Sequence, residues 1–157
     1  MWNKIKPYVI SILIALGVSG LSALVTKNNM SVYTDLNKPL LAPPMIVFPI
    51  VWNILFILMG ISSALVYVKG KDDKQKRNEA LRVYGLQLVV NFLWSIIFFN
   101  MRAYLFAFIW LIVLWLLIIY MIVKFHQISD IAAYLQLPYL IWVTFAGYLT
   151  LMIFILN

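Results

Sequence analysis

Five long stretches without a charged side chain dominate this sequence. Each holds roughly 19 residues or more, which is about what an α-helix needs to cross ~30 Å of hydrocarbon. The stretches are residues 7–26, 39–68, 83–101, 103–123 and 131–157. A membrane β-barrel would instead show shorter segments of alternating hydrophobicity. The chain is therefore predicted to be an all-α integral membrane bundle of five transmembrane helices.

The composition favours lipid as the main solvent. Of the 157 residues, 65% are hydrophobic and 11% are charged, whereas soluble domains are about half apolar and a quarter charged. A soluble fold of this size could not bury so much apolar surface. We expect a single membrane domain over residues 1–157, with an outer loop at 26–44. The spans are expected at about 7–25, 45–68, 81–100, 103–124 and 131–156.

Lysine and arginine are distributed unevenly between the two sides of such a bundle. One side carries only Lys27, Lys38 and Arg102, and the other side carries the remaining nine. Because cytoplasmic loops are enriched in these residues, the N-terminus is predicted to be cytoplasmic and the C-terminus outside. The first apolar run lacks a clear small-x-small cleavage site and is interpreted as a retained span. The net charge of +7 then reflects topology, so the expected partner is the lipid bilayer and not nucleic acid.

Small residues and prolines allow local predictions. A row of small residues on one face of the first span predicts close helix packing: Ala15, Ser19, Ser22 and Ala23. Gly60 offers a similar contact in the second span. Pro7 is expected to begin the first helix, and Pro138 is expected to kink the fifth. The fourth span, with no strongly polar residue inside, is interpreted as a structural wall. The long connection at 26–44 is either a lid or a passive loop.

Three polar residues, Gln87, Asn91 and Ser95, recur every four positions in the third span and so line one helix face. Amide side chains are costly in hydrocarbon without a partner, so they should point into the bundle. Two interpretations stay open: hydrogen bonding between helices, and a polar anchor in a ligand pocket.

Trp52, Trp94 and Trp142 lie inside spans and not at the interfaces, where aromatic belts normally form. They share faces with Asn91 and Ser95. An apolar pocket with a few polar groups is the usual form of a small-molecule site, and aromatic walls suit a flat hydrophobic ligand. Core packing explains the same pattern, so the pocket and the core remain alternatives.

No ionisable side chain lies inside any span. Ion pumps and proton relays need such groups, and no paired carboxylates or Ser-His-Asp set are available for acid–base catalysis. The absence of cysteine excludes disulfides and thiolate metal sites. His126, the single histidine, is interpreted as a surface residue. We expect no metal site and no required cofactor.

Several segments of the sequence resemble the motifs of one known protein family, in the same order and at the same spacing. They are Tyr33-Thr-Asp-Leu-Asn-Lys-Pro-Leu-Leu-Ala-Pro-Pro44, Gln87-Leu-Val-Val-Asn91-Phe-Leu-Trp94-Ser95 and Leu137-Pro-Tyr-Leu-Ile-Trp142-Val-Thr-Phe145-Ala146. With these motifs, nearly the whole chain resembles the TspO family, also called translocator proteins, peripheral benzodiazepine receptors or tryptophan-rich sensory proteins.

The resemblance implies a five-helix bundle, often a homodimer, whose outward-facing ligand cavity is capped by the first loop. Ligands of the family include porphyrins, haem-related tetrapyrroles, benzodiazepine-type and isoquinoline-carboxamide drugs and, in animal members, cholesterol. The residues that match the ligand-binding positions are Tyr33, Pro44, Phe48, Trp52, Phe56, Asn91, Trp94, Ser95, Trp142 and Ala146. In some bacterial relatives, the tryptophans that match Trp52 and Trp142 support light- and oxygen-dependent breakdown of protoporphyrin IX.

The chain departs from the family pattern at a few positions. Val32 and Leu41 stand where many relatives have tryptophan, which makes the loop side of the pocket less aromatic. Thr150 replaces a common asparagine. The sequence stops at Asn157, before the basic tail of the animal cholesterol motif, so cholesterol binding is not expected to carry over.

The leading hypothesis is a receptor in a bacterial cell membrane that binds protoporphyrin IX or a haem-related tetrapyrrole among the second, third and fifth spans. One alternative is photo-oxidative degradation of protoporphyrin IX, with Trp52 and Trp142 as the catalytic indoles. The other is tetrapyrrole transport. The odd number of spans and the lack of a coupling-ion site argue against active transport.

Overall fold

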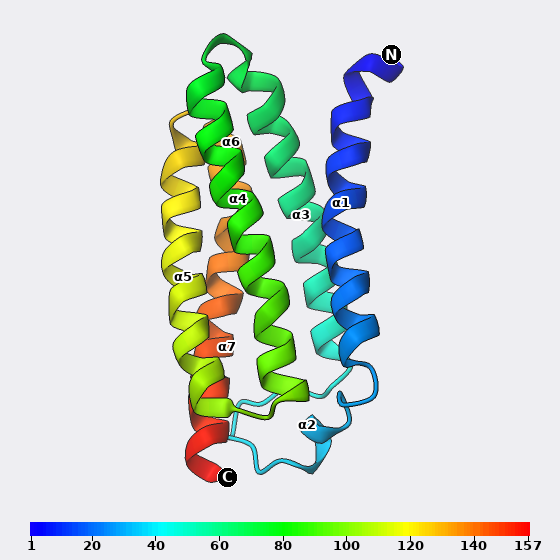
Figure 1. The fold of residues 1–157 in the computed structure, drawn as a ribbon, viewed down its shortest axis with the longest axis vertical. Helices are drawn as coiled ribbons and strands as arrows, with labels where there is room; N and C mark the ends of the chain where they lie inside the picture. The colour runs from blue at the N-terminus through cyan, green and yellow to red at the C-terminus, as the bar shows by residue number, and fades with distance from the viewer.

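Long helices make up most of the chain, and the computed structural model describes all residues, 1–157 (Figure 1). The helices are α1 (Trp2–Thr26), α2 (Val32–Asp35), α3 (Val47–Lys69), α4 (Lys74–Ser95), α5 (Tyr104–His126), α6 (Asp130–Leu135) and α7 (Leu137–Leu156). A 3-10 turn at Gly70–Asp72 joins α3 to α4, and a π-helical turn at Ile96–Asn100 extends α4. Five helical segments are long and apolar enough to cross a membrane, which confirms the predicted all-α fold.

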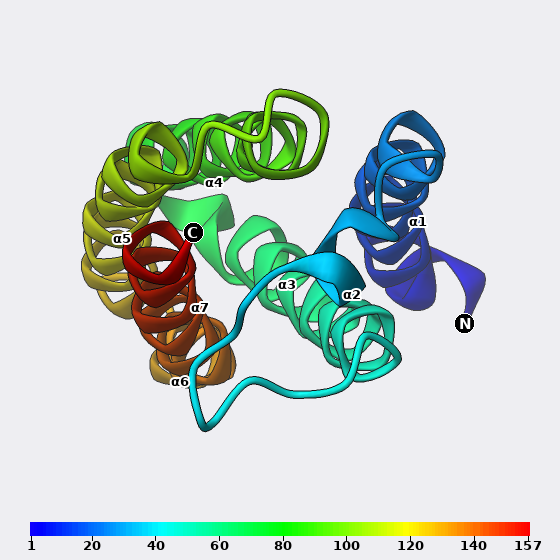
Figure 2. The same ribbon diagram turned by 90° about the horizontal axis from the view of Figure 1, so that it is seen from below.

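The two termini lie at opposite ends of the bundle (Figure 1). The connection between α1 and α3, residues 27–46, is hereafter called the cover segment. It contains α2 and runs across the end of the bundle that also holds the C-terminus, as Figure 2 shows from below. We call this the cover end. Any site between the helices at the cover end therefore lies directly behind the cover segment.

The prolines depart from one expectation and meet another. The prediction that Pro7 begins the first helix was wrong, because α1 begins at Trp2 and Pro7 lies inside it. The residues before Pro7 are exposed, so water can satisfy the backbone carbonyl that the proline leaves unpaired. The expected interruption near Pro138 is present as a break at Gln136 between α6 and α7. Pro138 itself sits in the first turn of α7, where no backbone donor is needed.

The contact between α1 and α3 depends on Gly60. A Cβ atom built on Gly60 would lie 2.6 Å from the Cα of Ile12. Only glycine at position 60 therefore allows the two backbones to approach so closely. Apart from this line of contact, α1 is peripheral, and its buried residues are only Ala15 and Thr26. In Figure 2, α1 stands beside α3 at the edge of the bundle.

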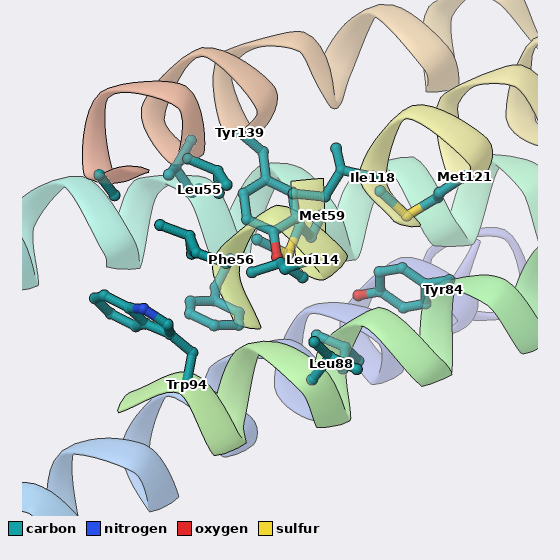
Figure 3. Close-up of a cluster of buried hydrophobic side chains, with 14 of the residues drawn as sticks. Leu55, Phe56, Met59, Tyr84, Leu88, Trp94, Leu114, Ile118, Met121 and Tyr139 are labelled. Atoms are coloured by element: carbon teal, nitrogen blue, oxygen red, sulfur yellow. The ribbon is translucent and has the colours of Figure 1, made fainter. Parts of the chain in front are cut away.

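The hydrophobic core lies among α3, α4, α5 and α7. Figure 3 shows its central cluster, in which Met59 of α3 and Leu114 of α5 lie close to Tyr139 of α7. The outer face of α5 carries exposed apolar residues at helical spacing: Leu105, Ile109, Ile112, Val113 and Leu116. A helix that is apolar on its inner and outer faces is suited to lipid on one side and protein on the other.

Candidate ligand cavity

A cavity of about 330 Å³ lies inside the cover end of the bundle. Its walls come from α1, the cover segment, α3, α4 with its π-helical turn, and α7, whereas α5 contributes no residue. The α5 helix is thus a wall of the bundle and not of the cavity. None of the lining residues is charged, so a ligand would meet an apolar surface with a few neutral polar groups.

The cavity brings together the ligand-binding residues predicted from sequence, with one exception. Those that line it are Tyr33, Phe48, Trp52, Phe56, Asn91, Trp94, Ser95, Trp142 and Ala146. Pro44 is exposed and is not part of the wall. The backbone next to it takes part indirectly, because the Tyr33 hydroxyl donates a hydrogen bond of 2.7 Å to the carbonyl oxygen of Pro43. In this structure Pro44 helps to shape the cover segment without facing the cavity.

Edge-to-face contacts hold the aromatic residues of the wall. The ring centroids of Trp52 and Trp142 are 6.3 Å apart with planes at 90°. Trp142 also meets Phe48 at 5.8 Å, and Phe48 meets Tyr33 at 5.0 Å. Such perpendicular pairs fix each ring through its neighbour. The two indoles therefore present differently oriented surfaces to the same space.

On the opposite wall, Trp94 stacks on Phe98 with ring centroids 5.3 Å apart. Phe98 and Phe99 belong to the π-helical turn and are both buried, and both line the cavity. A π-helical turn changes the direction in which successive side chains point. It extends the aromatic wall of α4 toward the cover segment, which the regular spacing of Gln87, Asn91 and Ser95 could not reveal.

The hydroxyl groups of the wall donate their protons within the protein. Ser95 donates to the Phe92 carbonyl at 2.7 Å, so Ser22 must be the donor in its 2.6 Å contact with Ser95. Thr26 donates to the Ser22 carbonyl at 2.7 Å. Thr150 does the same to the Ala146 carbonyl in α7, also at 2.7 Å. These hydroxyls offer a ligand lone pairs and no free proton.

A buried chain of hydrogen bonds runs from the cavity wall into the core. The Asn91 Nδ2 atom donates to the Tyr139 hydroxyl oxygen at 2.7 Å, and that hydroxyl donates to Gln87 Oε1 at 2.7 Å. Gln87 is fully buried and does not line the cavity, whereas Asn91 and Ser95 do. The two interpretations of this polar face therefore apply at different positions: Gln87 bonds another helix, and Asn91 also borders the cavity.

The cover segment is fastened over the cavity by Tyr33 and Lys38. Tyr33 is 2% exposed and lines the cavity from α2. The Lys38 ammonium lies 5.0 Å from the centre of the Tyr33 ring and donates to the carbonyl oxygen of Tyr33 at 3.1 Å and of Leu36 at 3.2 Å. Burial raises the pKa of Tyr33, so its hydroxyl stays protonated and keeps its bond to Pro43. The connection therefore lies across the cavity, and whether it opens as a lid stays a prediction.

A second fastening joins the cover segment to the C-terminal end of α7. The Asn157 side chain donates from Nδ2 to the Asn37 carbonyl at 2.9 Å and accepts at Oδ1 from the Asn37 backbone N–H at 3.1 Å. This paired contact brings together residues that are far apart in the sequence. It ties the cover segment to the helix that carries Trp142.

The α1 wall of the cavity was missed by the sequence reasoning. The small residues of α1 were predicted to pack against a helix, but Ser19, Ser22 and Ala23 line the cavity, and only Ala15 is fully buried in packing. The reason is that α1 touches α3 closely near Gly60, whereas toward the cover end its serines bond Asn53 of α3 and Ser95 of α4 at the edge of the cavity. The serines were the available clue, since packing alone does not require hydroxyls.

Comparison with known proteins supports one family. The sequence model of the TspO/MBR family matches residues 9–156. The chain is 38% identical to "Tryptophan-rich protein TspO" of Chlorobaculum tepidum over 94% of this chain and 92% of that protein. It is 32% identical to the protein of the same name from Archaeoglobus fulgidus over 98% and 99% of the two chains. It is also 34% identical to "Translocator protein" of Homo sapiens, over 72% of this chain and 67% of the human one.

Proposed function

Because the chain belongs to the TspO/MBR family, we propose that it is an integral membrane receptor for a planar tetrapyrrole such as protoporphyrin IX. The observation that carries the proposal is the uncharged aromatic cavity, in which Trp52 and Trp142 lie on adjoining walls. Flat aromatic surfaces stack on indole rings, and each such pair adds about 0.5–1.5 kcal/mol beyond burial of area.

The size of the cavity bears on how such a ligand would sit. Ligand pockets span about 300–1,000 Å³, and this cavity of about 330 Å³ is at the lower end of that range. We expect a macrocycle to enter with one apolar edge and to leave its propionate edge beneath the cover segment. Smaller benzodiazepine-type or isoquinoline-carboxamide ligands would fit more completely and should compete with it.

The test is a titration of protoporphyrin IX with the protein in lipid nanodiscs, followed by the shift of the main porphyrin absorption band. We expect saturable binding, weakened on the order of 100-fold in a Trp52→Ala/Trp142→Ala double variant, because two stacking surfaces are removed. Empty nanodiscs correct for porphyrin that dissolves in lipid.

Trp115→Ala is the matched control, since Trp115 lies outside the cavity and bonds Thr144 through its indole N–H. Its affinity for protoporphyrin IX should equal that of the wild-type protein. Equal affinities of the double variant and the wild type would contradict the assignment of the cavity.

The same pair of tryptophans favours a second candidate function, light- and oxygen-dependent breakdown of protoporphyrin IX. Both indoles border the cavity, so a bound sensitiser would lie close to two oxidisable side chains. Illumination under air should then bleach the porphyrin absorption band faster with the wild-type protein than with the double variant. Bleaching that simply follows the concentration of free porphyrin, or that continues under argon, would eliminate this candidate.

We further propose a bacterial-type orientation, with a cytoplasmic N-terminus and the cover segment outside. The uneven distribution of lysine and arginine supports it. In that orientation the ligand would approach the cavity from the outer side. A homodimer, as in the implied family architecture, is the expected assembly.

A further inference from the structure

The direction of the hydrogen-bond chain behind the cavity determines which atom of Asn91 a ligand would meet. Each hydroxyl has one proton, so Tyr139, which donates to Gln87 Oε1, must accept from Asn91 Nδ2. Tyr139 and Gln87 are buried and do not line the cavity. The Asn91 side chain therefore turns its amide nitrogen toward the core and leaves Oδ1 on the side of the cavity.

The neighbouring polar groups have the same character. Ser22, Ser95 and Thr150 have already given their protons to other atoms of the protein. The indole nitrogens of Trp94 and Trp142 have no hydrogen-bond partner, but neighbouring atoms cover both of them. The polar atoms that a ligand can reach between α1, α4 and α7 are thus hydrogen-bond acceptors. A ligand that brings only acceptors would leave Asn91 Oδ1 buried without a partner, which is unfavourable in a low-dielectric site.

We propose that Gln87 and Tyr139 are positioning residues, which hold the Asn91 side chain so that its Oδ1 atom can accept a hydrogen bond from a ligand. The cavity then selects flat apolar ligands that carry a pyrrole- or indole-type N–H donor on the edge that faces α4. The inference rests on the proposed function, because it assumes that the cavity takes a flat apolar ligand. It adds a rule of selection within that class.

Carbazole and dibenzofuran are suitable probes, because the two molecules have nearly the same shape. Carbazole carries an N–H donor where dibenzofuran has an ether oxygen. Their dissociation constants are measured in nanodiscs through quenching of protein fluorescence. The wild-type protein should bind carbazole about tenfold more tightly, the factor that an unmade hydrogen bond to a buried acceptor produces. Equal affinities, or a preference for dibenzofuran, would overturn the proposal.

Two variants separate positioning from simple loss of structure. In Gln87→Met the Tyr139 proton loses its acceptor and can turn to Asn91 Oδ1, so the amide reverses and the preference for carbazole should fall to about one or invert. In Tyr139→Phe the amide is no longer held, and the preference should also fall toward one while dibenzofuran affinity stays near wild type. Retention of the tenfold preference in Gln87→Met would overturn the role of the chain.

Thr144→Val is the control on the same helix as Tyr139. The Thr144 hydroxyl donates to the Leu140 carbonyl at 2.8 Å, outside the cavity wall, so the preference should remain tenfold. Size-exclusion elution identifies any variant that fails to fold. If neither probe nor protoporphyrin IX binds to the wild-type protein, the proposed function itself fails. Binding without a preference contradicts only the further inference.

Discussion

Replacing Gly60 with alanine should lower the thermal unfolding midpoint of the protein in detergent micelles, although alanine is the better helix former. The added Cβ would lie 2.6 Å from Cα and 2.9 Å from the backbone N of Ile12. Because backbone atoms cannot rotate away, α1 would have to move from α3, and overpacking of this kind costs ~1–3 kcal/mol. The midpoint is followed by tryptophan fluorescence during heating.

Gly17→Ala is the matched control for this change. Gly17 lies in α1, and a Cβ atom there would meet no atom of another helix within 4 Å. Only the helix propensity changes, by ~1 kcal/mol in favour of alanine. The midpoint should therefore stay the same or rise. A Gly60→Ala protein as stable as the Gly17→Ala protein would contradict the close approach of α1 and α3.

The second large effect is expected at the cover segment, where Tyr33→Ala should speed the release of bound protoporphyrin IX more than tenfold. The Tyr33 ring is buried against Phe48, and removal of a buried aromatic side chain costs about 3–5 kcal/mol. The cover segment lies outside the helical core, so the loss should appear as local opening and not as global unfolding. Hydrogen exchange of residues 27–46 and stopped-flow release measure the two consequences.

Tyr33→Phe separates the ring from its hydroxyl. This variant keeps the contact with Phe48 and loses the hydrogen bond to Pro43, a change of about 1 kcal/mol. Release should rise by no more than about fivefold. If Tyr33→Ala shows wild-type exchange in residues 27–46 and wild-type release, the cover segment does not act as a lid.

The number and type of the spans could be predicted from sequence because the membrane imposes its own rule. Backbone groups in hydrocarbon must bond within their own segment, so a long charge-free stretch such as residues 103–123 becomes a helix in almost any context. Helix boundaries were harder to predict. The α1 helix begins at Trp2 and continues past Pro7, because the exposed turn tolerates one missing backbone bond.

The cavity was predictable in part. Mid-span tryptophans with Asn91 and Ser95 on helical spacing indicated which faces of α3, α4 and α7 would meet. Pattern alone could not distinguish a residue that fills the core from one that borders a space, since both are apolar and inward-facing. Gln87 and Asn91 illustrate this: they share a helix face one turn apart, yet only Asn91 lines the cavity.

The five charge-free stretches thus determined by themselves that the chain spans a membrane as helices, because hydrocarbon excludes both charge and unpaired backbone. The spacing of Gln87, Asn91 and Ser95 further determined that these residues point inward. Only the tertiary structure decided that α1, beyond its contact with Gly60, is joined to α4 through Ser22 and Ser95 and that its serines border a cavity. It also decided that Tyr139 reaches from α7 to orient Asn91. Both features depend on how closely two helices approach, and that distance is set by the packing of side chains far apart in the sequence.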